Sequence, residues 1–312
     1  MNTTVALPPT RSLPRTLLGG VPIQAATRAE FRTAILADIA AIMRTPALER
    51  SGGAQLVATI NLDFLCNTYW PPQNFRRRRR YLRSLQTAAY ATADGMPLVW
   101  LARARGLAVP ERVSGADLTL DLLRGLPPEH SRATILCGDA ESYLAATERL
   151  ASIAPGLKCR GEFPRVDADG RLLDADSGAQ FSLGRTRDFF ERIPAHRPAL
   201  LLLGLSSPKQ ELIFRRYRRY IRAPIAVGMG GTVNFIAGRV RRAPEWLGRL
   251  GLEWLFRLAM EPARLWQRYF KNAVCLGLFT LTLLPLHRFA RVDGTARQRG
   301  LWSWLHRQRA PL

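Results

Sequence analysis

The chain has 312 residues, 47% of them hydrophobic, which is enough to form one large domain or two smaller ones. Its 46 basic residues outnumber the 24 acidic ones, and the formal charge of +22 favours an anionic partner such as nucleic acid, anionic lipid or a phosphorylated substrate. Four widely spaced cysteines argue against a zinc site or a disulfide framework, and Cys66 and Cys137, in apolar strand-like runs, are expected to be buried reduced thiols.

The first third of the chain predicts alternating strands and helices. Residues 1–20 are expected to be a flexible leader without the apolar core of a signal peptide. Residues 21–43 predict a short strand and then a helix that is capped near Thr27. A further strand is expected to end at residues 59–61, followed by a proline-broken loop and a basic helix within residues 69–91.

Three later segments contain short, continuous apolar strands. Residues 132–163 predict a strand–helix–strand unit, residues 197–221 a strand and a helix, and residues 223–238 a strand that ends in glycines. This alternation predicts the α/β class, with a Rossmann-like, mainly parallel sheet and helices on both faces. Ligands of such sheets bind at the carboxyl ends of the strands. The candidates there are Asn61, Asp94, Gly138, Gln210 and Gly228–Gly231.

The composition changes near Arg239. From there to Leu312 the chain has fourteen Lys or Arg against four Asp or Glu, and it contains five of the seven tryptophans. We therefore expect an α/β domain over residues 21–238 and a helical, basic and aromatic appendage over residues 239–312 that associates with membranes. The apolar run 274–286 is too short to span a bilayer and is expected to be a core helix or an interfacial segment.

Several polar positions allow both a chemical and a structural interpretation. Asp94 could act as a general base that accepts the proton of a hydroxyl group, but its spacing alone favours a turn aspartate. In "SSPKQE", Lys209, Gln210 and Glu211 occupy the first turn of a predicted helix, where backbone N–H groups favour anions or sugar hydroxyls. Taken in isolation, the motif favours ordinary helix initiation with a proline near the first position. "GMGG" resembles a phosphate-binding loop but lacks the full motif.

Two charged motifs are equally ambiguous. Asp167 with Asp169, and Asp174 with Asp176, form Asp-x-Asp patterns of the kind that bind a metal–nucleotide in many sugar transferases, but their flanks favour an exposed turn. The run Arg76–Arg80 could bind phosphate or face lipid, while a solvated helix face is the commoner outcome.

Arginines in the appendage recur at helical spacing. Arg257, Arg264 and Arg268 would share one face of a continuous helix, although Pro262 is expected to kink or restart it. Three converging guanidinium groups suit a diphosphate. The aromatic residues between them are also typical of an interfacial helix, and a packed helical pair with its arginines in solvent is the structural alternative.

Taken together, the motifs resemble the WecB/TagA/CpsF glycosyltransferases over roughly residues 20–270. Each motif is modest, but their order along the chain is highly specific. They are TINLD (59–63), ADG (93–95), PERVSGADL (110–118), PGLK (155–158), SPKQE (207–211), VGMGGTVNFIAG (227–238), RAPEW (242–246), GLEWLFRL (251–258) and EPARLWQRY (261–269).

This resemblance implies an inverting, metal-independent hexosyltransferase whose catalytic domain is the α/β domain. Such enzymes move a sugar, often N-acetylmannosamine or a hexose such as glucose, from UDP to a polyprenyl-diphosphate-linked saccharide in bacterial exopolysaccharide or cell-envelope glycan biosynthesis. The expected partners are therefore a UDP-sugar, the lipid-linked acceptor and an anionic membrane surface, with the protein peripheral on the cytoplasmic face of the membrane. No cofactor, metal or nucleic acid is expected, and homo-oligomerisation is left open.

The resemblance also implies roles for individual residues. Asp94 would be the general base, and Thr59 and Asn61 would complete the catalytic set. The C-terminal arginines would stabilise the UDP leaving group, which needs positive charge when no metal is present. The third of them is either Gln267 or, shifted by one, Arg268, and Asn234 stands where the family usually has Asp. The expected substrate-binding residues are Arg112, Lys209, Gln210, Gly230, Gly231, Asn234, Arg257, Arg264 and Arg268.

Two functions of other classes fit parts of the sequence. A basic nucleic-acid-binding protein would explain the charge, but the chain shows no recognised binding module and mixes its basic residues with Trp and Leu. A non-catalytic membrane scaffold would retain the appendage and would tolerate loss of the Asp94 carboxylate.

Overall fold

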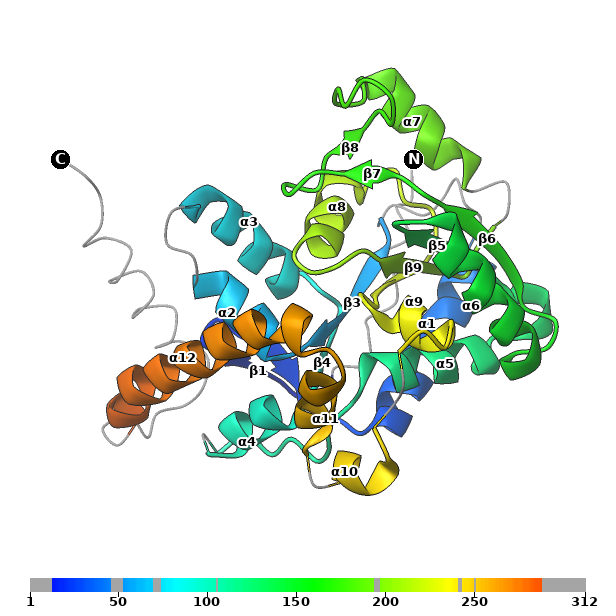
Figure 1. Cartoon of the computed structure of the whole chain (residues 1–312). Coiled ribbons are helices and arrows are strands. Elements are labelled where there is room, and N and C mark those ends of the chain that lie inside the picture. Colours follow the sequence, from blue (N-terminus) through cyan, green and yellow to red (C-terminus); the bar gives the residue numbers. More distant parts are fainter. Residues whose placement is uncertain are drawn as a thin grey trace, which may run out of the picture.

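A six-stranded parallel sheet forms the centre of the protein (Figure 1). The computed structural model describes residues 13–45, 53–69, 74–104, 106–193, 197–240, 243–249 and 251–287. The sheet strands are β3 (Gln55–Ile60), β4 (Tyr90–Ala93), β5 (Arg132–Cys137), β6 (Lys158–Glu162), β9 (Leu200–Gly204) and β10 (Ile225–Gly228). Their order is β4-β3-β10-β9-β5-β6, and every neighbouring pair is parallel. The predicted α/β class and mainly parallel sheet are confirmed.

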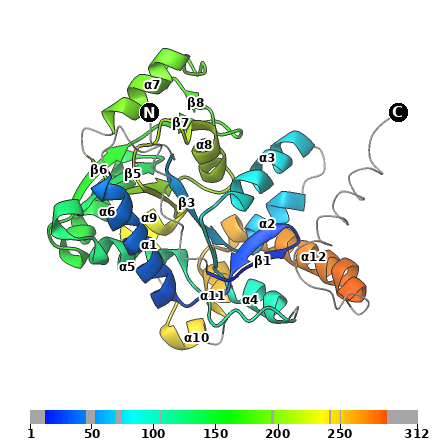
Figure 2. The same cartoon turned by 180° about the vertical axis from the view of Figure 1, so that it is seen from behind.

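Helices cover both faces of this sheet, as predicted, because its strands are apolar on both sides. In β3, Leu56 and Ala58 join one hydrophobic cluster while Val57, which points the other way, joins the second. The helices of the second cluster are α1 (Arg28–Arg44), α5 (Gly115–Gly125), α6 (Ala140–Ile153) and α9 (Thr232–Ile236), seen from behind in Figure 2. The first cluster includes α2 (Leu62–Tyr69), α3 (Phe75–Gln86), α4 (Met96–Ala104), α7 (Leu183–Arg192) and α8 (Lys209–Tyr217).

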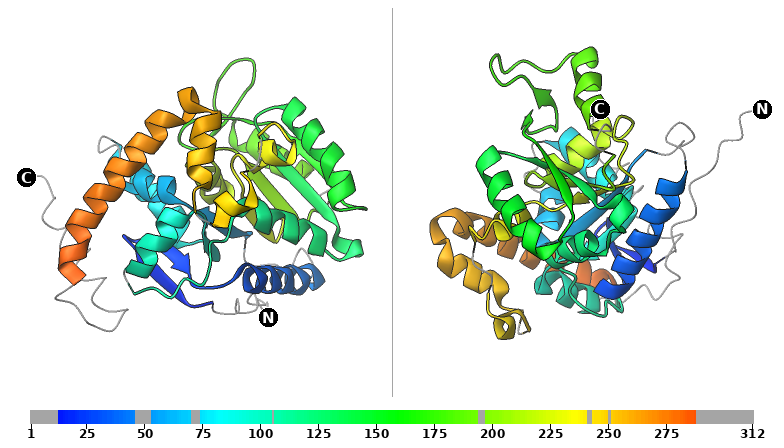
Figure 3. Two further views of the ribbon diagram at one scale, coloured as in Figure 1. Left: turned by 60° about the horizontal axis from the view of Figure 1, so that its bottom comes forward. Right: turned by 90° about the vertical axis from the view of Figure 1, so that its right-hand side faces the viewer.

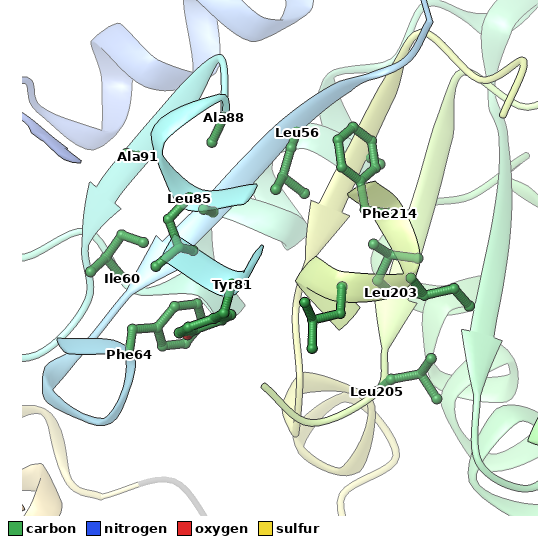
Figure 4. Close-up of a cluster of buried hydrophobic side chains, with 14 of the residues drawn as sticks. Leu56, Ile60, Phe64, Tyr81, Leu85, Ala88, Ala91, Leu203, Leu205 and Phe214 are labelled. Atoms are coloured by element: carbon green, nitrogen blue, oxygen red, sulfur yellow. The ribbon is translucent and has the colours of Figure 1, made fainter. Parts of the chain in front are cut away.

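The first cluster fixes α3 and α8 against the sheet (Figure 4). Tyr81 and Leu85 of α3 and Phe214 of α8 are all buried; Tyr81 lies beside Phe64 of α2, and Phe214 beside Leu56 of the sheet. Burying an aromatic or Leu side chain of this kind contributes roughly 1.5–3 kcal/mol. The ends of α3 and α8 are therefore firmly positioned relative to β3.

Local signals set the starts of two helices. The predicted cap near Thr27 is confirmed, since Glu30 N–H donates to the Thr27 hydroxyl over 3.2 Å and Thr27 N–H donates to the Glu30 carboxylate over 2.7 Å, a capping box. Helix α2 follows β3 directly and was not predicted from the sequence. Cys66 lies buried in this helix rather than in a strand, whereas Cys137 lies in β5 as predicted.

Ordered structure begins before residue 21. β1 (Arg15–Leu18) and β2 (Val21–Gln24) form an antiparallel hairpin, so the prediction of a flexible leader is wrong for residues 15–18. Residues 1–12 lie outside the described part of the chain. One short 3₁₀ helix, η1 (Pro128–His130), precedes β5.

Two acidic pairs lie in turns. β7 (Arg165–Val166) and β8 (Leu172–Leu173) are antiparallel, and in the turn between them the Asp167 carboxylate accepts the N–H of Asp169 over 2.8 Å. The Asp174 carboxylate accepts the N–H of Ser177, also over 2.8 Å. These bonds support the turn interpretation. No group of three or more His, Cys, Asp or Glu side chains that could hold a metal ion occurs within the described ranges.

The C-terminal part consists of α10 (Glu245–Arg249), α11 (Glu253–Met260) and the long α12 (Pro262–His287), which runs along one side of the molecule (Figure 3). Glu261 leaves helical geometry (φ −135°, ψ 58°), so the two helices are separate. One side of α12 packs on α2 and the β1–β2 turn, where the rings of Phe279 and Tyr69 lie 6.0 Å apart, centroid to centroid. No described helix is both long and apolar enough to cross a bilayer.

The other side of α12 exposes a row of apolar side chains at intervals of three and four residues. We call this row the α12 apolar face; its side chains are 46–73% exposed. Residues three or four apart lie on the same side of a helix. The face consists of Trp266, Phe270, Val274, Leu278 and Leu281.

Candidate active site

The predicted strand-end residues meet at the carboxyl edge of the sheet. Thr59 lies at the end of β3, Asp94 follows β4, and the glycine loop 228–231 follows β10. Because β3 pairs with both β4 and β10, these three ends are neighbours. The arrangement is the one in which open α/β sheets bind ligands.

Asp94 is held at the start of α5 and is partly exposed. Its Oδ2 atom accepts the N–H of Gly115 over 3.1 Å. Burial raises the pKa of the Asp94 carboxyl, while the Gly115 hydrogen bond and the charges of Arg112 and Arg257 lower it; the net result is a pKa above the ordinary value. A raised pKa makes the carboxylate a stronger base near neutral pH.

The two arginines whose charges act on Asp94 share one acidic partner. Glu253 of α11 accepts a hydrogen bond from Arg112 through Oε2, and its Oε1 lies 3.3 Å from Arg257 Nη2. The guanidinium carbon of Arg257 also lies 4.3 Å from the ring centroid of Phe235 in α9, a cation–π distance. The C-terminal helices thus place Arg257 where its charge lowers the pKa of Asp94.

Gln210 and Thr59 fix the glycine loop. Gln210 is buried, and its Oε1 accepts the N–H of Gly230 over 2.9 Å. The Thr59 hydroxyl donates to the carbonyl of Gly228 over 2.9 Å. A Cβ atom on Gly228 would lie 2.9 Å from the Gln210 amide nitrogen, and Gly230 adopts a left-handed φ of +48°, so this loop depends on glycine.

Glu211 lies behind Gln210 and was not singled out as a site residue from the sequence. It is fully buried, and its Oε1 accepts the Gln210 side-chain N–H over 2.6 Å. The Ser207 side chain also forms a hydrogen bond with this carboxyl, and its Oγ lies 2.7 Å from the hydroxyl oxygen of Tyr81. Burial raises the pKa of Glu211 to about 7. The chain of bonds links α3 to the glycine loop and orients the Gln210 amide.

Other expected site residues have partners elsewhere. Asn61 accepts the N–H groups of α2 residues 63 and 64 and so caps that helix. Lys209 donates to the carbonyl of Val166 over 3.2 Å. Asn234 lies 3.4 Å from the Ser142 hydroxyl.

The expected shared face of the C-terminal arginines is wrong for Arg257 and Arg268. Arg268 lies 3.6 Å from Asp63 of α2, beside Lys271, because Glu261 and Pro262 separate the two helices. The alternative third position, Gln267, is exposed. The side chain of Arg264 lies outside the described part of the chain.

Three acids that pair with expected site residues were missed: Asp63, Glu211 and Glu253. Each lies inside one of the motifs quoted above. Glu253 carried a usable signal, because it is one of only four acids in the strongly basic appendage and such a carboxylate is expected to pair with neighbouring arginines. Glu211 carried none, because a first-turn Glu is ordinarily exposed.

Replacing Glu211 by Gln should flatten the pH dependence of stability. With a pKa of about 7 when folded and 4.5 as the ordinary value, the folded chain keeps a proton that the unfolded chain loses. The Glu211 carboxyl therefore makes its full contribution to the free energy of unfolding below about pH 4.5. That contribution falls by roughly 3 kcal/mol as the pH rises to about 7. Urea unfolding of wild type and Glu211→Gln between these pH values measures the difference. Parallel curves would contradict it, and Glu191→Gln, on the surface of α7, is the control.

Comparison with known proteins identifies the family. A family model described as "Glycosyl transferase WecG/TagA/CpsF family" matches residues 16–288, through the end of α12. Two relatives carry the name N-acetylglucosaminyldiphosphoundecaprenol N-acetyl-beta-D-mannosaminyltransferase. One, from Bacillus spizizenii, is 28% identical over 240 residues, covering 77% of this chain and 83% of the relative; the other, from Bacillus subtilis, is 27% identical over 207 residues, covering 66% and 72%. The chain belongs to the glycosyl transferase WecG/TagA/CpsF family.

Proposed function

We propose that the protein is an inverting glycosyltransferase that moves a sugar from UDP to a polyprenyl-diphosphate-linked saccharide. The observation that carries the proposal is one carboxylate, Asp94, with a raised pKa and two arginines, Arg112 and Arg257, acting on it from separate elements. A base and a fixed positive charge are the two requirements of a metal-free sugar transfer from a nucleotide.

In the proposed reaction, a hydroxyl oxygen of the acceptor attacks the anomeric carbon of the donor sugar. Asp94 takes the hydroxyl proton as the new C–O bond forms. The bond between the anomeric carbon and the diphosphate oxygen breaks, its electron pair stays on UDP, and the configuration at carbon inverts. Arg257 and Arg112 stabilise the departing diphosphate, which would compete with Glu253 for their N–H groups.

The names of the two relatives support this choice of substrates. They specify a diphosphoundecaprenol-linked acceptor and a transferred N-acetylmannosamine in β linkage. Inversion of an α-linked nucleotide sugar gives a β linkage. For this chain we propose N-acetylmannosamine or a hexose such as glucose, and a panel of UDP-sugars assayed with and without chelator tests both the donor and the proposed metal independence.

The C-terminal helices would serve two purposes. Through Arg257 they complete the site of the α/β domain, residues 21–238. Through the α12 apolar face they would bind the cytoplasmic surface of the membrane, where a lipid-linked acceptor is found. A helix with exposed Trp, Phe and Leu on one side is the type that lies within the interface.

The variant Asp94→Asn should lose catalysis and keep its nucleotide site. An amide cannot accept the acceptor proton, so kcat should fall by roughly 10²–10⁴. The Kd for UDP, measured by calorimetry, should change little. Asp188→Asn, on the surface of α7, is the matched control. Full turnover by Asp94→Asn would eliminate the proposed base and would be the result expected of a non-catalytic scaffold.

Replacing Arg257 by Ala should lower kcat by about 10²-fold, the usual effect of removing one charge-stabilising donor. Arg257→Lys should recover part of this loss, because an ammonium group keeps the charge and loses the forked geometry. Steady-state kinetics with the UDP-sugar identified by the panel measures both. Equal activity of Arg257→Ala and wild type would show that Arg257, and with it this part of the appendage, does not contribute to catalysis.

Substituting Trp266 and Phe270 together by Ser should weaken binding to anionic vesicles by at least about tenfold, since each ring contributes more than 1 kcal/mol when buried in an interface. Vesicle co-flotation measures the effect. The control is Leu144→Ser with Leu183→Ser, which removes two exposed apolar side chains outside α12. Transfer to a short water-soluble acceptor should be unchanged, and an equal loss in both double variants would argue against membrane docking through α12.

A further inference from the structure

A second basic site lies at the opposite edge of the sheet. A cavity of about 660 Å³ opens between α3, α8 and the β7–β8 turn, elements that adjoin one another in Figure 1. It reaches Gly53, at the beginning of β3, whereas Asp94 lies beyond the carboxyl ends of the strands. Its volume is in the range of small-molecule sites. The lining is Gly53, Arg80, Thr87, Asp169, Leu212, Phe214, Arg215, Arg216, Arg218 and Arg219.

The charge of this lining is unbalanced. It contains five arginines and a single carboxylate, Asp169, which lies 3.2 Å from Arg80 Nη2. The buried Nε atom of Arg80 has no hydrogen-bond partner within the described residues. Like charges gathered around one hollow repel one another, and a bound anion relieves that repulsion.

Close packing fixes the frame of the cavity. A Cβ atom on Gly53 would lie 2.7 Å from the carbonyl oxygen of Arg218, so the segment after α8 lies directly against the start of β3. Arg218 is held there by a 3.1 Å bond from its Nε to the carbonyl of Ala54. Leu212 and Phe214 in the lining are buried, and Phe214 packs in the cluster of Figure 4. The cavity therefore has an ordered apolar side and a guanidinium rim.

We propose that this cavity is a second anion site, which binds a ligand carrying adjacent phosphate groups. Guanidinium groups match phosphate oxygens through forked, charge-assisted hydrogen bonds, and several of them on one rim suit a ligand with more than one phosphate. A soluble polyphosphate and the headgroups of anionic lipids share this chemistry. The inference does not rest on the proposed sugar transfer, because no residue of the Asp94 site lines the cavity.

The test removes two charges from the rim. Arg215→Gln with Arg219→Gln is compared with Arg187→Gln with Arg222→Gln, two exposed arginines outside the lining. All chains carry Arg257→Ala, so that the candidate active site contributes less to phosphate binding. Calorimetry with inorganic tripolyphosphate at physiological salt measures the affinity, and circular dichroism verifies folding.

We expect the rim variant to bind tripolyphosphate at least about tenfold more weakly than the control variant. If tripolyphosphate affinity is equal but the rim variant alone loses flotation with phosphatidylglycerol vesicles, relative to phosphatidylcholine vesicles, the site is one for lipid headgroups. Equal behaviour of the two double variants in both assays would overturn the inference. Neither assay uses a sugar donor, so failure of the proposed transferase activity leaves this result unaffected.

Discussion

The carboxylate of Glu253 connects the two halves of the candidate active site. It bonds to Arg112 of the α/β domain and to Arg257 of its own helix, and this pairing turns α11 toward the carboxyl edge of the sheet. Two cations so close together would repel each other without it. The same carboxylate slightly opposes ionisation of Asp94, so it offsets part of what the arginines contribute. The position of α11 and part of the electrostatics of Asp94 therefore depend on the same carboxylate, while burial contributes most to the raised pKa of Asp94.

The opposing influences on Asp94 suit a general base. Burial raises the pKa of the Asp94 carboxyl, which makes it a stronger base than a fully exposed carboxylate. The Gly115 N–H and the charges of the two arginines oppose this effect of burial and lower the pKa of Asp94. Glu211, which is fully buried, has a pKa of about 7 and accepts a hydrogen bond from the Gln210 amide. The two carboxyls, Asp94 partly exposed and Glu211 fully buried, thus both have raised pKa values but different hydrogen-bond partners.

Much of this molecule follows from its sequence. The buried strands and the polar residues that follow them are local properties, and their alternation with helices predicts a mainly parallel sheet. Asp94, Gln210 and the glycine loop could therefore be placed at one edge of the sheet before any coordinates, and the resemblance added Thr59. The helix break at Glu261 and the pairing of Arg268 with Asp63 could not, because they depend on contacts between distant segments. Helix α2 escaped prediction for a related reason: its cap, Asn61, was interpreted as a strand-end ligand residue.

The packing of α12 on α2 has a geometric consequence. Helix α2 begins directly after Asn61, and Asp63, its second residue, lies within 4 Å of basic groups on α12. The row from Trp266 to Leu281 is roughly 22 Å long at 1.5 Å per residue. If that row lies at the level of the lipid phosphates, the packing of α12 on α2 sets the distance between the bilayer and the carboxyl edge of the sheet, where Asp94 lies. In that geometry, the distance between this edge of the sheet and the headgroups limits how far from the bilayer a sugar in the site can lie.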